Sequence, residues 1–398
     1  MTALVESSVP SEPFGYLITS IAMAWMTFSA LVPLRRPRWL AQVSFQSGLL
    51  VSEQPFYPFY LLLGLTLLAQ VEGNLNTGVG WLALGITLMV SIGLAVIAIS
   101  STRTAGVVAR ALDAGLGANG ETPVEGARSQ RLPLVHILFA PLSTRRLDVR
   151  RTRNLSYGDA GRQNQLDVYS RRSRPQGGGV LIFFHGGRFS SGRKSFESRV
   201  LLNTLASAGW VCISANYRVG RSAHFPDHLV DAKKVIAWAR ENAGAYGADT
   251  STVVVGGSSA GAHLASMCAL TGGRPEFQPG FEDVDTSISA AVCLYGWYGA
   301  VSDESSRSSP HDFIPPTAGT VVPPFFVAHG TNDTLVAVKR AREFVARLRT
   351  ETDALVVYAE LPRAQHAFDL FHSIRSDIVV RGITVFLRSA LQPGRRRT

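Results

Sequence analysis

The chain of 398 residues has few cysteines and few charged residues for its length. Its three cysteines, Cys212, Cys268 and Cys293, each lie in an apolar run. Three thiols cannot build the paired framework of a small disulfide-rich domain, so we interpret them as small core residues. Charged residues make up only 17% of the chain and hydrophobic residues 46%. This composition is more apolar than that of a typical soluble protein and suggests that part of the chain lies in lipid.

Three long apolar stretches occupy the first hundred residues. Residues 15–34 and 78–100 contain no charged residue, and at about 1.5 Å per residue each is long enough to cross the hydrocarbon core of a bilayer. Residues 56–71 are shorter and equally uncharged, and we predict a third transmembrane helix there. A secretory signal peptide is the competing interpretation of the first stretch. The residues before it include two glutamates and no basic residue, so the positive region of a signal peptide is missing.

The charges that flank these stretches predict an orientation in the membrane. Arg35, Arg36 and Arg38 follow the first stretch, and Glu72 is the only charged residue between the second and the third. Under the positive-inside rule, the N-terminus is then outside and everything after residue 100 is cytoplasmic. We therefore expect a multi-pass protein of the bacterial plasma membrane with a cytoplasmic C-terminal domain.

Lysine is scarce, because only four of the 39 basic residues are lysines, and the formal net charge is +10. Nine arginines and four acidic residues fall within residues 101–153, which we predict to be a juxtamembrane linker. Its arginines either bind the anionic head groups of membrane lipids or serve only as topology signals. We expect no nucleic-acid partner, since a site a few residues from a membrane has little access to one.

From residue 154 onward, short apolar runs alternate with helical patterns. The runs predict buried strands at residues 180–184, 211–215, 252–255, 290–295, 325–329 and 354–359. The helical patterns are clearest at residues 227–242, 336–350 and 373–391. This alternation predicts an α/β fold with a doubly wound, mostly parallel sheet over residues 154–393, followed by a basic tail at 394–398. Sites in such sheets form at the carboxyl ends of the strands.

Two serines follow the third predicted strand, in the segment GGSSAG, and the pattern around them favours one. Centred on Ser259, the segment fits G-x-S-x-G with Gly257 and Gly261 as flanks, whereas a frame centred on Ser258 has one glycine replaced by alanine. The strand-to-helix turn of a nucleophile elbow is so sharp that it needs small residues at these flanks. We predict Ser259 as the nucleophile and a structural Gly/Ser turn as the alternative.

A serine hydroxyl needs a base to remove its proton and an acid to orient that base. His366 follows the last predicted strand, and Asp333 follows the strand before it. The chain order Ser259, Asp333, His366 is that of an α/β-hydrolase triad. The weaker candidates are His372 as the base and Asp303 or Asp312 as the acid.

The oxyanion of a tetrahedral intermediate also needs hydrogen-bond donors. The first predicted strand ends in His185 followed by Gly186, Gly187 and Arg188. Backbone N–H groups of this HGG loop, together with that of Ala260, predict an oxyanion hole.

Residues 154–391 resemble the α/β-hydrolase-fold esterases of the hormone-sensitive-lipase-like and related carboxylesterase group. The resemblance rests on the segments YGDAGRQNQLDVY, HGGRF, SANYR, FPDHLVDAKKVIAWAREN, GGSSAGAHLA, HGTNDTLV and QHAF. The membrane-anchored arrangement is similar to that of some actinobacterial lipase/esterase proteins. The resemblance implies Ser259 as nucleophile, His366 as base, Asp333 as orienting acid and an HGG oxyanion hole. Arg188 stands where the family usually has a third glycine.

Together these patterns predict a membrane-anchored serine carboxylesterase or lipase that hydrolyses apolar, small-molecule or lipid esters and needs no metal or organic cofactor. An amidase or deacetylase on the same triad is the alternative within hydrolases, and an inactive binding protein at the membrane is the alternative outside enzymes. Four aromatic residues at strand ends are candidates for an acyl pocket or for the core: Phe189, Tyr217, Trp297 and Tyr298. A lid is expected from the linker or from residues 302–324.

Overall fold

The structure is a computed structural model. It describes residues 13–117, 131–173, 177–221, 223–301, 307–314 and 321–392. The expected basic tail, Asp303 and residues 302–306 and 315–320 of the second expected lid segment lie outside these residues.

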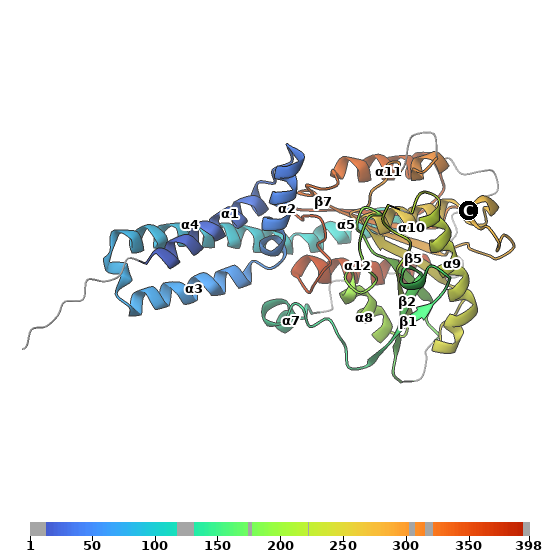
Figure 1. The fold of residues 1–398 in the computed structure, drawn as a ribbon, viewed down its shortest axis with the longest axis horizontal. Coiled ribbons are helices and arrows are strands. Elements are labelled where there is room, and N and C mark those ends of the chain that lie inside the picture. Colours follow the sequence, from blue (N-terminus) through green and yellow to red (C-terminus); the bar gives the residue numbers. More distant parts are fainter. Residues whose placement is uncertain are drawn as a thin grey trace, which may run out of the picture.

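An eight-stranded sheet forms the centre of the C-terminal domain (Figure 1). Its strands are β1 Val149–Ser156, β2 Gln165–Arg171, β3 Val180–Phe184, β4 Val211–Ala215, β5 Val253–Ser258, β6 Ala290–Leu294, β7 Phe325–Gly330 and β8 Val356–Leu361. They lie in the order β1-β2-β4-β3-β5-β6-β7-β8, with β1 and β2 antiparallel to their neighbours and the other six parallel. The six parallel strands are the six predicted ones, with ends shifted by a few residues. Their buried, apolar side chains explain why periodicity found them.

Helices cover both faces of this sheet. They are α8 Arg199–Ser207, α9 Asp227–Asn242, α10 Ala260–Leu270, α11 Val338–Glu351 and α12 Ile374–Ala390. Side chains of α9, α10 and α11 form one apolar core on the sheet, and those of α8 and α12 contribute to a second. Short 3-10 turns occur at Asn74–Asn76, Gly161–Asn164, Ala243–Tyr246, Pro275–Phe277 and Pro310–Phe313. The layered architecture is the doubly wound α/β fold that the alternating pattern predicts, and it agrees with the α/β-hydrolase fold that the resemblance implies.

The N-terminal part contributes six helices in the described ranges. They are α1 Phe14–Leu31, α2 Arg38–Glu53, α3 Phe56–Val71, α4 Gly78–Thr102, α5 Thr104–Leu116 and α7 Leu134–Phe139. Helices α1, α3 and α4 lie side by side and extend away from the C-terminal domain (Figure 1). In the described part, two helical segments, Phe14–Leu31 and Gly78–Leu116, are long and apolar enough to cross a membrane. Phe56–Val71 is apolar but has only 16 residues.

The stretch expected to be a linker is largely folded onto the C-terminal domain. Helix α5 packs against β8 and α12, and a Cβ on Gly115 would come within 2.7 Å of the Val356 carbonyl oxygen. Strand β1 begins at Val149, ahead of the expected boundary at residue 154. The difference arises because β1 is an edge strand with many polar, exposed residues, so it lacks the apolar run by which buried strands are recognised.

A buried ion pair joins the N-terminal helices to the C-terminal domain. Arg375, at the start of α12, is fully buried and places Nη1 at 2.9 Å from Oε1 of Glu53 at the end of α2. The other Glu53 oxygen accepts a hydrogen bond from Ser373 at 2.9 Å, and Arg375 Nη2 donates to Ser100 of α4 at 3.2 Å. A charged pair taken out of water depends on partners of this kind, so these contacts hold α2 on the domain.

Candidate active site

The turn at Ser259 has the geometry of a sharp strand-to-helix elbow. Ser259 lies between β5 and α10 with φ 54° and ψ −113°, a conformation that L-residues rarely adopt. A Cβ on Gly257 would lie 2.2 Å from the backbone of Gly261, and one on Gly261 would lie 2.0 Å from the carbonyl oxygen of Phe184. Both flanking positions therefore require glycine. The backbone N–H of Ser259 donates to Leu294 at 2.9 Å, which holds the elbow against the end of β6.

Asp333 and His366 are in direct contact although they come from different loops. Asp333 follows β7, His366 follows β8, and Nδ1 of His366 lies 2.7 Å from Oδ2 of Asp333. Oδ1 of Asp333 accepts the backbone N–H groups of Leu335 and Val336 at 2.9 and 2.8 Å. These bonds fix the carboxylate and leave its other oxygen for the imidazole.

The charge state of Asp333 follows from its surroundings. Burial by itself would raise the pKa of this carboxyl, but His366 and a hydrogen bond from His329 outweigh burial and hold the pKa well below its usual range. His329 Nε2 lies 3.2 Å from Oδ2 of Asp333. The carboxylate is therefore ionised at neutral pH and can stabilise a positive charge on His366.

Ser259 and this pair all follow the carboxyl ends of neighbouring parallel strands. The ring of His366 packs on Tyr295 with centroids 4.5 Å apart, and Tyr295 follows Leu294, the acceptor for the Ser259 N–H. Within the described residues, Ser259 Oγ makes no hydrogen bond, so its bond to His366 is not formed in this state. Such bonds are often long in unliganded enzymes and tighten when substrate binds.

The HGG loop lies directly beside Ser259. A Cβ on Gly186 would approach Cβ of Ser259 to 3.0 Å. Gly187 has φ 124°, and a Cβ there would meet the Ser191 carbonyl oxygen at 2.1 Å, so this position requires glycine. Arg188 adopts a left-handed φ of 56°, which arginine can reach at a cost of about 1–2 kcal/mol. The arginine at the position of the family's third glycine is thus accommodated, but its backbone is strained.

The backbone N–H of Gly186 is not available to a substrate. It donates to Oε2 of Glu197 at 2.5 Å, so this predicted oxyanion donor is used inside the protein. The N–H groups of Gly187, Arg188 and Ala260 have no acceptor among the described residues. Ala260 is also the first residue of α10, where the helix dipole favours a negative charge.

The sequence analysis missed two carboxyl groups near Ser259, those of the partly buried Glu197 and the buried Asp369. Glu197 accepts the hydroxyl of Ser258 as well as the Gly186 N–H, and Asp369 accepts the hydroxyl of Tyr295. Burial first, and Asp369 second, raise the pKa of Glu197 to about 7, and burial also raises the pKa of Asp369. Ser258 therefore helps to hold Glu197 in place through this hydrogen bond. No local pattern marks Glu197, because its partners are distant in the sequence.

Helix α2 contacts the proposed catalytic residues at the carboxyl ends of the strands. The ring of Phe45 lies 6.1 Å from that of His366, and Gln42 Oε1 accepts from Arg188 at 3.5 Å. The Ala41 carbonyl accepts the hydroxyl of Thr334, the residue after Asp333, at 3.1 Å. Among the described residues, these contacts over the site come from residues 38–53.

The weaker acid and base candidates have other structural roles. Nδ1 of His372 contacts both oxygens of Asp377 at 3.0 and 3.1 Å, near the start of α12. Asp312 accepts the Ser309 N–H at 2.9 Å in a capping box. His185 is buried and stacks on Tyr217, and burial lowers its pKa to about 4, so it is neutral at pH 7. The described residues contain no group of three or more His, Cys, Asp or Glu that could hold a metal ion.

Two of the four aromatic candidates for an acyl pocket belong to the core. Tyr217 is buried and donates its hydroxyl to the His185 carbonyl at 2.8 Å. Tyr298 is buried and stacks on Phe344 with centroids 4.2 Å apart. Phe189 and Trp297 are partly exposed and remain candidates for contact with a substrate.

Comparison with known proteins identifies relatives over most of the chain. The BD-FAE family matches residues 166–302. The chain is 33% identical to a Mycobacterium tuberculosis protein named probable carboxylic ester hydrolase LipM, over 94% of this chain and 92% of that protein. It is 36% identical to esterase LipQ of the same organism, over 67% of this chain and 68% of that protein. A solved structure of an inhibited esterase B from Lactobacillus rhamnosis shares the fold, with a TM-score of 0.52 and 17% identity over 67% of this chain and 90% of that one.

Proposed function

The chain belongs to the family of carboxylic ester hydrolases that includes LipM and is an ester-hydrolysing enzyme, and from this premise we propose that it is a serine carboxylesterase with Ser259 as nucleophile. The observation that carries the proposal is the strained elbow at Ser259 beside the Asp333–His366 pair. The HGG loop and GSSAG elbow further favour a place among the hormone-sensitive-lipase-like esterases.

In the proposed mechanism, His366 takes the proton of Ser259 as Oγ attacks the ester carbonyl carbon. The alcohol leaves with a proton from His366, and an acyl-enzyme remains on Ser259. Water activated by His366 then attacks the acyl carbonyl, and the acid and free Ser259 are released. Asp333 accepts the Nδ1 proton of His366 in a hydrogen bond and stabilises the imidazolium in both steps.

The proposed oxyanion hole consists of the N–H groups of Ala260 and of Gly187 or Arg188. The bond from Gly186 to Glu197 removes Gly186 as a donor and at the same time fixes the loop that carries the other two. Losing one such donor costs roughly 100- to 1000-fold in turnover. The reaction so derived uses no metal or organic cofactor.

Labelling with a fluorophosphonate probe tests the nucleophile on the full-length protein in detergent. We expect a single adduct on Ser259 by peptide mass spectrometry, abolished in Ser259→Ala and retained in Ser258→Ala. Ser258→Ala should slow turnover without abolishing it, because Ser258 binds Glu197, which holds the HGG loop, and takes no part in the proposed chemistry. An adduct on Ser258, or no adduct at all, would refute the proposal, and the latter would favour an inactive binding protein.

We further propose that α1, α3 and α4 cross the membrane and that the catalytic domain is cytoplasmic. The contacts favour this arrangement, because the Ala30 carbonyl at the end of α1 and Ser100 near the end of α4 both bind the C-terminal domain. Gln54, just before α3, also binds the domain through the His372 carbonyl. Three passes then place the arginine-rich turn after α1 on the same side as the domain.

Labelling of a single introduced cysteine tests this orientation. The three native cysteines are buried, so their background is low. We expect Asn76→Cys, in the exposed turn before α4, to react with an impermeant maleimide in intact cells, and Ser251→Cys in the catalytic domain to react only after lysis. The opposite pattern would overturn the orientation.

The substrates that fit this site best are apolar carboxylic esters, including lipid-derived ones. Phe45 supplies an apolar surface next to His366, and the helix that carries it lies beside the proposed membrane spans. An amidase or deacetylase would use the same residues. Matched acyl esters and anilides of acetyl to palmitoyl chains, assayed on the full-length protein, separate the two, and faster hydrolysis of the anilides would favour the alternative.

A further inference from the structure

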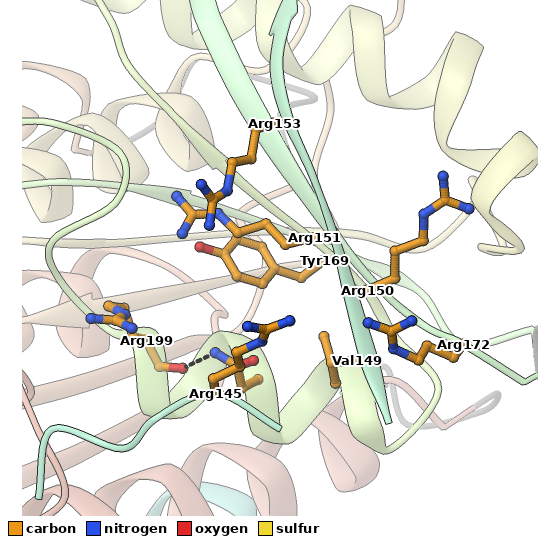
Figure 2. Close-up of a pocket in the computed structure, with 9 residues that line it drawn as sticks. Arg145, Val149, Arg150, Arg151, Arg153, Tyr169, Arg172 and Arg199 are labelled. Atoms are coloured by element: carbon orange, nitrogen blue, oxygen red, sulfur yellow. Dashed lines mark hydrogen bonds between the residues drawn. The ribbon is translucent and has the colours of Figure 1, made fainter. Parts of the chain in front are cut away.

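A strongly cationic pocket lies at the β1 edge of the sheet, away from the proposed catalytic residues at β5, β7 and β8. It has a volume of about 250 Å³, and six of its nine lining residues are arginines. Figure 2 shows that these side chains come from β1, the turn before it, the end of β2 and the start of α8. Ester hydrolysis as derived above uses none of them.

Most of these arginines form no ion pair within the described part of the chain. Arg151 pairs with Asp167, with Nε at 3.0 Å from Oδ2. In the ranges that the structure describes, Arg145, Arg153 and Arg199 form no ion pair. Arg151 and Arg153 are two positions apart on β1 and so project from the same face of the strand. Guanidinium groups gathered around one pocket repel one another, and a bound anion would offset this repulsion.

The pocket also contains a buried tyrosine hydroxyl group that has no partner in the described part of the chain. Tyr169 of β2 lines the same pocket and is only 3% exposed, yet its hydroxyl has no hydrogen-bond partner among the described residues. Buried hydroxyl groups are normally hydrogen-bonded, so an unpartnered buried hydroxyl group indicates that a ligand binds in this pocket. In Figure 2 the Tyr169 hydroxyl and the side chains of Arg153 and Arg199 project to the same side of β1.

We propose that this pocket binds a phosphoryl group, held by Arg145, Arg153 and Arg199 and by the Tyr169 hydroxyl. A phosphoryl group has several acceptor oxygens and up to two negative charges. It can therefore take fork-like hydrogen bonds from more than one guanidinium and a further one from a phenol. A single carboxylate has only two oxygens and one charge, and satisfies this donor set less well.

Calorimetric titration with inorganic pyrophosphate tests the site on the full-length protein in an uncharged detergent. We expect saturable binding that weakens as salt is added. Arg153→Gln and Tyr169→Phe should each weaken it by about tenfold or more. The control is Lys339→Gln on α11, which packs at the opposite edge of the sheet and removes the same charge from an exposed position. Thermal melting of each variant checks that it is folded.

The source of the phosphoryl group is distinguished with the same chain in nanodiscs of phosphatidylcholine, with or without phosphatidic acid. Weaker pyrophosphate binding in discs that contain phosphatidic acid supports the site and identifies a lipid head group as its occupant. Equal binding in both discs supports the site and identifies a soluble phosphate compound. The proposal is overturned if pyrophosphate shows no saturable binding, or if Lys339→Gln weakens binding as much as Arg153→Gln does.

Discussion

The ring of Phe45 packs edge-on against the imidazole of His366, with centroids 6.1 Å apart and planes at 76°. Phe45 belongs to α2 in the N-terminal part of the chain, and His366 follows the last strand of the sheet. The proposed catalytic base is therefore covered by a helix from outside the C-terminal domain.

Phe45→Ala should change chain-length preference more than it changes the chemistry. Removing the ring opens space above His366, so we expect kcat/KM for long acyl esters to rise relative to short ones by roughly tenfold. The measurement is a profile of 4-nitrophenyl esters from acetyl to palmitoyl. Trp39→Ala, at an exposed position of the same helix, should leave the profile unchanged. Equal effects of the two substitutions would mean that Phe45 does not face the substrate.

Asp333→Asn should lower kcat by roughly 10⁴-fold with little effect on folding, because an amide cannot stabilise the imidazolium and favours the wrong tautomer of His366. Steady-state kinetics with a soluble short-chain ester measures the loss. Asp312→Asn is the matched control, since Asp312 caps a short helix instead. If Asp312→Asn abolished activity and Asp333→Asn did not, the assigned acid would be wrong.

Glu197→Gln should alter the pH dependence of stability. The pKa of Glu197 rises on folding from an ordinary value of 4.5 to about 7, chiefly through burial. Its stabilising contribution is therefore complete below about 4.5 and is lost as pH rises through about 7. We expect the melting temperature of the wild type to fall more between pH 5 and pH 8 than that of Glu197→Gln, as measured by differential scanning fluorimetry. Glu241→Gln, at an exposed position, should follow the wild type.

Glu53→Gln should destabilise the whole protein, because it leaves the buried guanidinium of Arg375 without its counter-charge. The expected cost is about 3–5 kcal/mol, which is typical for removal of one partner of a buried pair. Thermal unfolding and trypsin sensitivity of the catalytic domain report it. Asp113→Asn, an exposed acidic position in α5, is the control. A variant as stable as the wild type would show that α2 docks independently of this pair.

The sequence by itself determined the parts of this protein that local rules govern. The six parallel strands are continuous apolar runs, the glycines at 257 and 261 reveal the elbow, and residues 14–31 and 78–102 are apolar enough to be recognised as long helices. It also placed Asp333 and His366 after neighbouring strands, so their contact was predictable once the sheet was assumed to be parallel.

Only the tertiary structure decided what lies around that site. Glu197 meets Ser258 and Gly186, Phe45 meets His366, and Arg375 meets Glu53, each across a long stretch of chain. The same holds for the cationic pocket. Four of its six arginines lie in the predicted linker, and they meet the other two only because β1 packs beside β2 and α8. Periodicity reports which face of an element is buried, but not which distant residue it is buried against. Contacts of that kind depend on the packing of the whole chain.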